Sequence, residues 1–508
     1  MIQRILSKSK LIAFRQCPKR LWLEVHQPQL REESKSTQAI FRTGHEVGEL
    51  AQRLYNPRGQ GDLVDLHAEG VGPAIERSKS LLQGRTPVFE AGFAAGGAMA
   101  FADVMLPVTQ EGKIAWRMVE VKSSTSVKDY YLDDVAIQSF VARESGVPLV
   151  GVSLSHIDSS WIYKGDGDYR GLLVEKDLTQ IAFSRADEVR TWIAAAHAVA
   201  SRESPPAIDT GLQCEDPFPC SFSAHCHRDK PSAEFPVTWL PRIQSKTLKT
   251  YIQVNAVVDM RDIPESLLNL QQKRVRDQTV SGECFFDADG ARSDLQRYEL
   301  PAYFLDFETI QFAVPKWTGT RPFQSLPFQF SLHHLDEQGA LVQYGFLDLS
   351  GNDPTHSFAR SLVETCGSLG PVFVYNSGFE GSRITELAQR FSELKPSLLS
   401  IKQRLVDLLP IAQARFYHPS QRGSWSIKRV LPAVAPQLNY QQLTGVQDGD
   451  MAMQAFLEAI SPETSEQRKQ EIHVQLQAYC ALDTLAMVEI WKVFSGRVSF
   501  QQRKTNLS

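Results

Sequence analysis

The sequence has no long hydrophobic run, no strong excess of charge of either sign, and few cysteines. Its apolar stretches fall short of the roughly 20 residues that a membrane-spanning helix needs, so we expect no membrane contact. The segment before Arg15 lacks the apolar core of a signal peptide, which argues against secretion and favours a cytoplasmic protein. Lysine and arginine total 54 against 58 aspartates and glutamates, a net charge of −4 that excludes a simple basic protein coating nucleic acid.

Cysteine is too scarce for a disulfide framework. There are 7 cysteines among 508 residues, an odd number that indicates a metal or cluster site, or buried thiols. The 31 glycines and 27 prolines are near the average, which excludes a collagenous or low-complexity chain. The length predicts about two to four domains, and no repeat at a fixed period is visible.

Three regions follow one another along the chain. Residues 1–230 alternate helical patterns with short apolar runs such as AFADVMLPV and LVGVSLSHI, which is typical of an α/β domain. Residues 231–299 read mainly as helices, and we interpret them as a helical connector, a packing spacer in preference to a small DNA-contacting unit. Residues 300–508 begin with the strand-like PAYFLDFETI and alternate again, so the predicted fold class is α/β on both sides of the connector.

Positive charge is concentrated at the N-terminus. The first 23 residues contain no acidic residue, and their basic residues are Arg4, Lys8, Lys10, Arg15, Lys19 and Arg20. Such a face suits contact with phosphates, and a solvated helix surface explains it equally well.

The strand that opens the last region carries two carboxylates. Asp306 and Glu308 are two residues apart in YFLDFET, and because side chains alternate along a strand, both point to one face. Two buried acidic groups side by side repel each other unless a cation lies between them, and a hard divalent ion such as Mg²⁺ or Mn²⁺ is the natural one. Further along, Glu380 follows a second strand, and Tyr479 and Asp483 share one face of a predicted helix.

The order Asp-x-Glu, Asn-x-x-Phe-Glu and Tyr-x-x-x-Asp resembles the DEDDy subclass of 3′–5′ exonucleases, which have an RNase H-like fold. The resemblance implies that Tyr479 orients the attacking water and that two metal ions are held by four carboxylates, Asp306, Glu308, Glu380 and Asp483. The chain departs from the family's pattern at Glu380, where the second motif usually ends in aspartate. Asp407 falls where the family often has another acidic residue, and we interpret it as a helix N-cap.

The first region carries a second acidic motif. Asp103 ends the strand AFADVM, and the next strand, WRMVEVKSS, places Glu120 and Lys122 on one face. These three residues resemble the PD-(D/E)XK nuclease core, a restriction-endonuclease-like fold, and Gln138 matches the glutamine-bearing helix of its RecB branch. The resemblance implies that Asp103 and Glu120 hold a divalent ion and that Lys122 positions the attacking water. Glu90, on the preceding strand, is a further acidic candidate for the same pocket.

Four of the cysteines form a separate pattern. Cys17 precedes a proline near the N-terminus, and Cys214, Cys220 and Cys226 cluster just after the nuclease-like core. One distal and three clustered cysteines resemble the iron–sulfur site of CRISPR-associated RecB-like nucleases, which implies a 4Fe–4S cluster that clamps the N-terminal helix to the end of the domain. Four thiolates also suit tetrahedral zinc, but the clustered cysteines are spaced more widely than those of common zinc ribbons.

These resemblances imply a metal-dependent nuclease with two phosphodiesterase centres. We expect DNA, single-stranded or with free ends, as the substrate, and DNA processing, repair or defence against foreign DNA as the context. A protein partner such as a helicase is compatible with that context. Two alternatives stay open: an RNase D-like 3′–5′ exoribonuclease that acts on RNA, and a nucleic-acid-binding scaffold with an inactive centre. No RNA-binding module with stacking aromatics is visible, which favours DNA.

Overall fold

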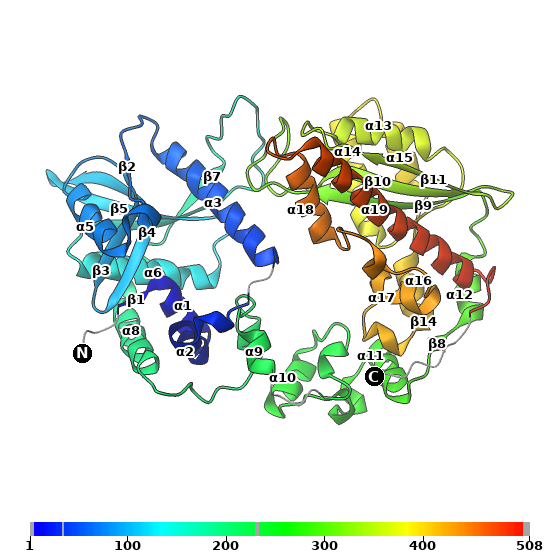
Figure 1. Cartoon of the computed structure of the whole chain (residues 1–508), viewed down its shortest axis with the longest axis horizontal. Helices are drawn as coiled ribbons and strands as arrows, with labels where there is room; N and C mark the ends of the chain where they lie inside the picture. Colours follow the sequence, from blue (N-terminus) through cyan, green and yellow to red (C-terminus); the bar gives the residue numbers. More distant parts are fainter. Residues whose placement is uncertain (1–4, 33–34, 229–232, 501–508) are drawn as a thin grey trace. The chain divides into compact units, whose positions relative to one another are not determined.

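The computed structural model describes residues 5–32, 35–228 and 233–500, and only the backbone of residues 35–39. The chain divides into two compact units, Met1–Lys230 with Phe312–Gln324, and Pro231–Gln311 with Ser325–Ser508 (Figure 1). Each unit is mixed α/β, as the alternating sequence pattern predicts. No helix in the described part of the chain is long and apolar enough to cross a membrane.

The first unit is built on a seven-stranded sheet in the order β2-β3-β4-β5-β6-β7, with β1 paired to β4. Strands β3, β4 and β5 are antiparallel neighbours, and β6 lies parallel to β5. The strands are β1 (Leu6–Ser7), β2 (Asp62–Leu63), β3 (Val88–Ala95), β4 (Ala98–Gln110), β5 (Lys113–Lys122), β6 (Leu149–Ile157) and β7 (Leu173–Asp177). The helices are α1 (Lys8–Gln16), α2 (Pro18–His26), α3 (Lys35–Tyr55), α4 (Leu66–Glu69), α5 (Val71–Leu81), α6 (Asp129–Glu144), α7 (Thr179–Ser184), α8 (Ala186–Ala200) and α9 (Ser223–His227).

Helix α6 is the central helix of the first unit, and it packs against β3, β4 and β6 (Figure 1). Its residues 134–142 are all buried, and the apolar ones among them join the main apolar core with α1 and α8. Gln138 is fully buried within this stretch and therefore needs an internal hydrogen-bond partner. Helix α3 contributes Val47 and Leu50 to a second apolar cluster, which also includes Val121 of β5.

The segment Phe312–Gln324 belongs to the first unit although it lies between two strands of the second. Ala313 and Val314 are buried in the same apolar cluster as Val47 and Leu50. Backbone hydrogen bonds join Tyr163 to Gly319 and Thr320, at 2.8 and 3.0 Å. The domain boundaries expected from the sequence place this segment in the C-terminal domain. They miss its membership of the first unit, because the residues that it contacts there are distant in the sequence.

The second unit contains a five-stranded sheet in the order β11-β10-β9-β12-β13 and a two-stranded pair of β14 and β8. Strands β9, β10 and β11 are antiparallel, whereas β12 runs parallel to β9 and β13. The strands are β8 (Phe285–Phe286), β9 (Ala302–Ile310), β10 (Leu326–Leu335), β11 (Leu341–Leu347), β12 (Val372–Val374), β13 (Leu405–Asp407) and β14 (Phe416–Tyr417). The helices are α10 (Lys246–Val254), α11 (Leu270–Ser281), α12 (Ala288–Leu295), α13 (Thr355–Thr365), α14 (Ser377–Arg390), α15 (Lys395–Gln403), α16 (Leu408–Arg415), α17 (Ile427–Val434), α18 (Gly449–Ala459) and α19 (Glu466–Phe494).

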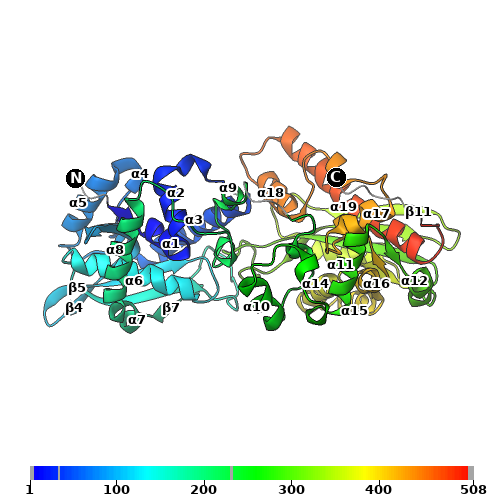
Figure 2. The ribbon, with the colours of Figure 1, turned by 90° about the horizontal axis from the view of Figure 1, so that it is seen from below.

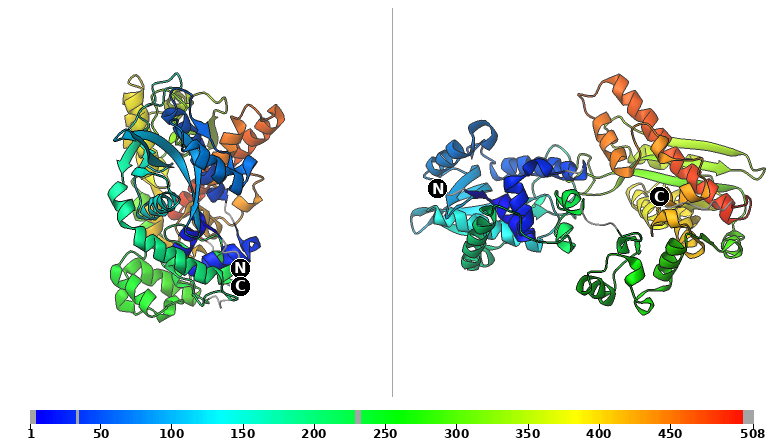
Figure 3. Two further views of the ribbon diagram at one scale, coloured as in Figure 1. Left: turned by 90° about the vertical axis from the view of Figure 1, so that its left-hand side faces the viewer. Right: turned by 60° about the horizontal axis from the view of Figure 1, so that its bottom comes forward.

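Helices cover both faces of this five-stranded sheet (Figure 2). The long helix α19 packs on β9 and β10 (Figure 3), and its Met487 and Trp491 share an apolar core with Phe304 of β9. On the other face, Leu305 of β9 packs in a separate core with residues of α13, α14 and α15, Phe358 among them. Side-chain alternation along β9 thus directs odd-numbered and even-numbered residues to different layers, which fixes the face on which its carboxylates lie.

Residues 233–299 are mainly helical, as expected, but they are not a separate connector. The structure groups them with the second unit. Leu248 of α10, Val275 of α11 and Leu295 of α12 are buried in the same apolar core as Phe304 and Trp491. The apolar side chains of these short helices therefore pack into the body of the C-terminal domain, whose N-terminal boundary lies near residue 231 and not near residue 300.

Candidate functional site

Three carboxylates meet in the second unit. Within the described residues, Asp306, Glu308 and Asp483 place ligand oxygens within 4.8 Å of one another. The first two come from β9 and the third from α19, which packs on that strand. Asp306 and Glu308 share one strand face, as the spacing predicts, and Glu308 and Asp483 are only 8% and 5% exposed.

Glu380 adds a fourth acidic group from the first turn of α14. It is 2% exposed, and its Oε2 is buried without a hydrogen-bond partner. Its charge helps to raise the pKa of Asp306, which places it in the electrostatic range of the other carboxylates. A buried carboxylate oxygen without a donor is unfavourable, so this position suits a bound cation.

Asp407 fixes the start of the helix that carries Glu380. Its carboxylate accepts hydrogen bonds from the backbone N–H groups of Asn376 and Ser377, at 3.0 and 2.8 Å. It also accepts from the N–H of Leu409 and caps α16, so the predicted N-cap is confirmed. The same side chain therefore joins two helix starts.

Burial dominates the electrostatics of this carboxylate cluster. It raises the pKa of Glu380 to about 8 and that of Asp483 to about 6. It also raises the pKa of Asp306 and Glu308 well above their ordinary values, and repulsion from Asp483 adds to both shifts. The cluster thus holds more negative charge than the protein itself neutralises, which is the arrangement that a divalent cation relieves.

Tyr479 lies one helical turn before Asp483 and is 4% exposed. A hydrogen bond from Tyr479 and one from Tyr440 both lower the pKa of Asp483. The Tyr440 hydroxyl donates to Asp483 Oδ1 at 2.5 Å. The predicted tyrosine is therefore beside the acidic cluster, together with a second tyrosine that the sequence motifs do not indicate.

Lys428 of α17 is the second residue that sequence reasoning misses. Its Nζ lies 4.8 and 5.3 Å from the ring centres of Tyr479 and Tyr440, and its charge lowers the pKa of Asp306, Glu308 and Asp483. Its ammonium also donates to the backbone carbonyl of Gln447 at 3.0 Å. Lys428 and Tyr440 lie on short elements between the second and third motifs, where no periodic pattern distinguishes them from surface residues.

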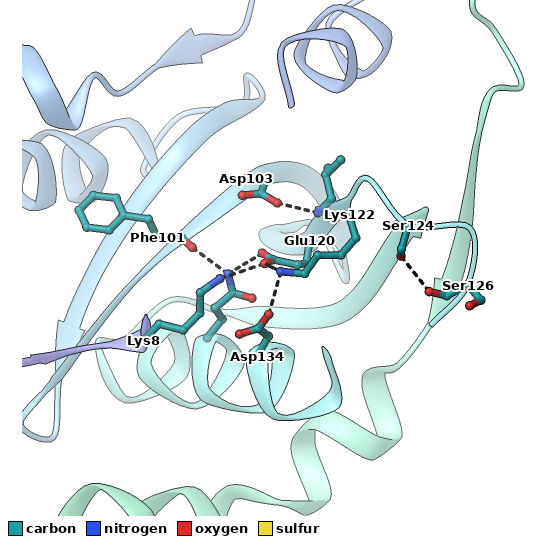
Figure 4. A network of polar contacts seen from close by, with 10 residues as sticks. Lys8, Phe101, Asp103, Glu120, Lys122, Ser124, Ser126 and Asp134 are labelled. Atoms are coloured by element: carbon teal, nitrogen blue, oxygen red, sulfur yellow. Dashed lines mark hydrogen bonds and ion pairs between the residues drawn. The ribbon is translucent and has the colours of Figure 1, made fainter. Parts of the chain in front are cut away.

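Glu90, Asp103 and Glu120 come from three neighbouring strands, β3, β4 and β5. Figure 4 shows Asp103 and Glu120. Glu90 falls between the pairs Phe89–Val104 and Ala91–Ala102, so it stands opposite Asp103 of β4. Asp103 Oδ2 in turn accepts from the N–H of Val121 on β5, at 2.6 Å, next to Glu120. Glu90 adopts a left-handed conformation, φ 54°, which is rare for a non-glycine residue inside a strand and is common at functional sites.

Both oxygens of the Glu120 carboxylate accept hydrogen bonds from neighbouring side chains. Its Oε1 accepts from Lys122 at 2.8 Å and from Lys8 at 2.9 Å, and its Oε2 accepts from Gln138 at 2.5 Å. Burial raises its pKa, but the two lysines outweigh burial and hold that pKa below its usual range. Lys122 also donates to Asp134 of α6 at 2.7 Å. The structure thus brings Glu120, Lys122 and Gln138 together, as predicted.

Asp103 has the opposite electrostatic environment. Burial, and then repulsion from Glu120 and Glu90, raise its pKa well above the ordinary value. Within the described residues, the carboxylate oxygens of Glu90, Asp103 and Glu120 do not all lie within 4.8 Å of one another. Sequence reasoning misses Asp134, although it lies four residues before Gln138 on the same face of one helix and could have been found from that spacing.

The four predicted cysteines, all within the described residues, line one cavity. Cys17 lies between α1 and α2, and the other three come from the loop that follows α8 and from α9. None of the four is in a disulfide. Burial raises the pKa of Cys220, and the charges of Cys214 and Cys17 add to that shift. Cys284, Cys366 and Cys480 are elsewhere and are partly or fully buried.

Protein contacts join the two ends of the first unit around this cavity. The side-chain amide of Gln16, just before Cys17, donates to the carbonyls of Gln213 and Phe218, at 2.9 and 2.7 Å. The Trp22 indole donates to the carbonyl of Arg202 at 2.9 Å. Direct hydrogen bonds thus attach the N-terminal helices to the end of the unit.

Not all the basic residues of the predicted N-terminal face lie on the protein surface. Arg4 lies outside the described residues. Lys8 is paired with Glu120, and Arg15 with Asp133 at 3.0 Å. The Lys8 ammonium therefore binds a buried carboxylate and is not part of a solvated surface, whereas the Arg15 side chain is 39% exposed and pairs with Asp133 at the surface.

Comparisons with known proteins give limited information about this chain. A family model described as a domain of unknown function, DUF2779, matches residues 303–426. The matched span contains Asp306, Glu308 and Glu380 and ends just before Lys428. The chain is also similar to an "Uncharacterized protein MG366 homolog" of Mycoplasma pneumoniae, with 27% identity over 218 residues. That alignment covers 39% of this chain and 33% of the Mycoplasma protein, so the chain matches about a third of that relative's length.

Proposed function

We propose that the protein is a metal-dependent nuclease with two phosphodiesterase centres, one in an RNase H-like second unit and one in a PD-(D/E)XK-like first unit. The observation that carries the proposal is the group of four carboxylates in the second unit, of which Glu308, Glu380 and Asp483 are buried and Asp306 is partly buried. They come from three elements far apart in the sequence, and one oxygen of Glu380 has no donor. Because burying uncompensated negative charge is unfavourable, such a group is best explained by the cations that it binds.

In the second unit, Asp306, Glu308, Glu380 and Asp483 would hold two ions, Mg²⁺ or Mn²⁺. Such ions supply a hydroxide at neutral pH and stabilise the leaving oxygen of a phosphodiester. The Tyr479 hydroxyl is buried beside Asp483, where it can orient the attacking water. Lys428 provides the positive charge that would attract and hold a phosphate next to the acidic cluster.

In the first unit, Asp103 and Glu120 would hold the divalent ion, with Glu90 as a third acidic neighbour. Lys122 donates to Glu120 and to Asp134, so its ammonium is held at a defined place from which it can position water or a phosphate oxygen. Gln138 is a positioning residue, since its amide donates both to Glu120 and to the carbonyl of Phe101 at 2.8 Å.

The cysteine cavity would hold a 4Fe–4S cluster, with tetrahedral zinc as the alternative. It is lined by Cys17, Cys214, Cys220 and Cys226, and four cysteine thiolates are the ligand set of such a cluster. The clustered cysteines are also spaced more widely along the chain than those of common zinc ribbons. Anaerobic purification should give a brown protein with absorbance near about 400 nm, and a colourless protein containing zinc would contradict the cluster.

One experiment tests the two nuclease centres separately. The protein is purified anaerobically, and cleavage of end-labelled single-stranded DNA, duplex DNA and RNA is compared with Mg²⁺, Mn²⁺ or EDTA. Asp306→Asn should abolish 3′-end degradation, and Lys122→Met should abolish the remaining cleavage. Matched controls are Glu337→Gln, an exposed carboxylate of the second unit, and Lys113→Met, an exposed lysine of the strand that carries Lys122.

The outcomes separate the hypotheses. Degradation of RNA and not DNA would replace the DNA nuclease by an RNase D-like exoribonuclease. No cleavage of any substrate, with binding of labelled DNA retained, would indicate a scaffold. Cleavage that neither Asp306→Asn nor Lys122→Met reduces would refute both proposed centres.

A further inference from the structure

The first unit contains a second lysine at its acidic group. Lys8 begins α1, and its ammonium reaches the same Glu120 oxygen that Lys122 binds (Figure 4). The Lys8 side chain is 22% exposed and that of Glu120 only 2%, so the ion pair is largely shielded from solvent. Since Gln138 donates to the other oxygen, both oxygens of Glu120 are already bound within the protein.

The fold fixes the position of Lys8. The two residues before it, Leu6–Ser7, form β1 and pair with β4, the strand that carries Asp103. The Ser7 hydroxyl caps α1, and Leu11 and Ala13 of that helix are buried. At the far end of α1, Arg15 pairs with Asp133 of α6. Lys8 is therefore presented to Glu120 by an anchored helix and is not a mobile surface lysine that contacts it by chance.

Charge determines what Lys8 does at this place. A divalent ion bound by Glu120 needs an oxygen that Lys8 now occupies, and it would lie close to two ammonium groups of its own sign. Lys122 keeps Asp134 as a partner when Glu120 is taken by an ion. The ion and the Lys8 ammonium therefore compete for the Glu120 carboxylate.

We infer that Lys8 is a positioning residue that competes with the divalent ion for Glu120. It neutralises this carboxylate in the metal-free protein and sets the ion concentration at which the first centre is loaded. The inference rests on the proposed function of the first unit. It assigns Lys8 a role in metal loading, and it requires that removing the Lys8 charge strengthens metal binding.

The test measures Mn²⁺ binding and not cleavage. The full-length protein carries Asp306→Asn and Asp483→Asn, which remove two of the four ligands proposed for the second unit. The free Mn²⁺ is followed by electron paramagnetic resonance. Lys8→Met should bind Mn²⁺ about tenfold more tightly, because a competing charge a few ångströms away is gone. Lys8→Gln, which keeps a hydrogen-bond donor for Glu120, should show the same direction. Lys8→Arg should restore the original affinity, and Lys10→Met on the same helix should leave it unchanged.

Each result either supports or overturns the inference. In one outcome, the parent binds Mn²⁺ and Asp103→Asn abolishes that binding, but Lys8→Met and Lys8→Gln bind Mn²⁺ no more tightly than the parent. This outcome refutes the competition and leaves the proposed metal centre intact. If neither the parent protein nor the Lys8 variants bind Mn²⁺ through Asp103, the proposed metal centre itself fails, and the inference fails with it. Lys8→Gln also provides the measurement if Lys8→Met does not fold.

Discussion

Glu380→Gln is the substitution that most directly tests the electrostatics of the second unit. Burial raises the pKa of Glu380 from 4.5 to about 8, so the native carboxyl is protonated over a pH range in which the unfolded one is ionised. The native state then binds more protons than the unfolded state, and the free energy of unfolding falls as the pH rises between these two values. Each pH unit in that range removes about 1.4 kcal/mol, so going from pH 5 to pH 7 costs about 2.7 kcal/mol in the metal-free protein.

Glutamine cannot ionise, so the variant should lack this loss. This loss is measured by urea unfolding in EDTA at pH 5, 6 and 7. The quantity compared is the difference in the free energy of unfolding between Glu380→Gln and the parent. We expect that difference to shift by about 2 to 3 kcal/mol in favour of the variant from pH 5 to pH 7. Glu386→Gln on the same helix, whose carboxylate pairs with Arg383, is the control for the loss of one acidic group. A difference that is the same at pH 5 and pH 7 would show that Glu380 is not held in a buried, undercompensated site.

Three further predictions concern single side chains. Lys428→Met should lower the rate of 3′-end degradation at least about tenfold, with partial recovery in Lys428→Arg, because a positive charge beside the acidic cluster is lost; steady-state kinetics on labelled single-stranded DNA checks this. Tyr440→Phe removes the hydrogen bond to Asp483 and should weaken Mn²⁺ binding to the second unit by roughly tenfold, measured by calorimetry. Cys220→Ser should lower the iron content and the unfolding temperature of the first unit and leave cleavage by the second unit intact; equal iron in variant and parent would contradict a cysteine-bound cluster.

Local patterns in the sequence are sufficient to predict part of the fold and of both sites. Strand alternation places Asp306 and Glu308 on one face, and likewise Glu120 and Lys122, because a period of two leaves little freedom once one face is buried. Helix periodicity does the same for Tyr479 and Asp483. What brings Lys8 to Glu120 is different, since 112 residues separate them and only the packing of α1 on the sheet sets their distance.

The same reason explains the missed elements of the second unit. Tyr440 and Lys428 reach Asp483 from short segments whose positions depend on tertiary packing, and no local period predicts that. The helices of residues 231–299 are predictable, but their membership of the C-terminal core is not, because it depends on contacts with Phe304 and Trp491 far along the chain. The segment Phe312–Gln324 is a further case, in which the order of elements in the sequence does not give their grouping in space.

The two centres neutralise their acidic groups in different ways, and this difference has a measurable consequence. In the first unit, Lys8 and Lys122 both bind Glu120 directly, so much of the negative charge is balanced without an ion. In the second unit, the charge of Lys428 lowers the pKa of Asp306, Glu308 and Asp483, and burial raises the pKa of all four carboxylates. An ion therefore replaces an existing cation in the first unit but relieves repulsion in the second.

Mn²⁺ should accordingly stabilise the second unit more than the first. A ligand at 100 times its dissociation constant adds about 2.7 kcal/mol to the stability of the unit that binds it. Hydrogen exchange followed by mass spectrometry, with Mn²⁺ or EDTA, resolves the two units: protection in α14 and α19 should rise at Mn²⁺ concentrations that leave α6 unchanged. In Lys8→Met, protection in α6 should rise at lower Mn²⁺ than in the parent. Equal protection of α6 and α19 at every Mn²⁺ concentration in the parent would mean that the lysines of the first unit do not balance its carboxylates as the contacts imply.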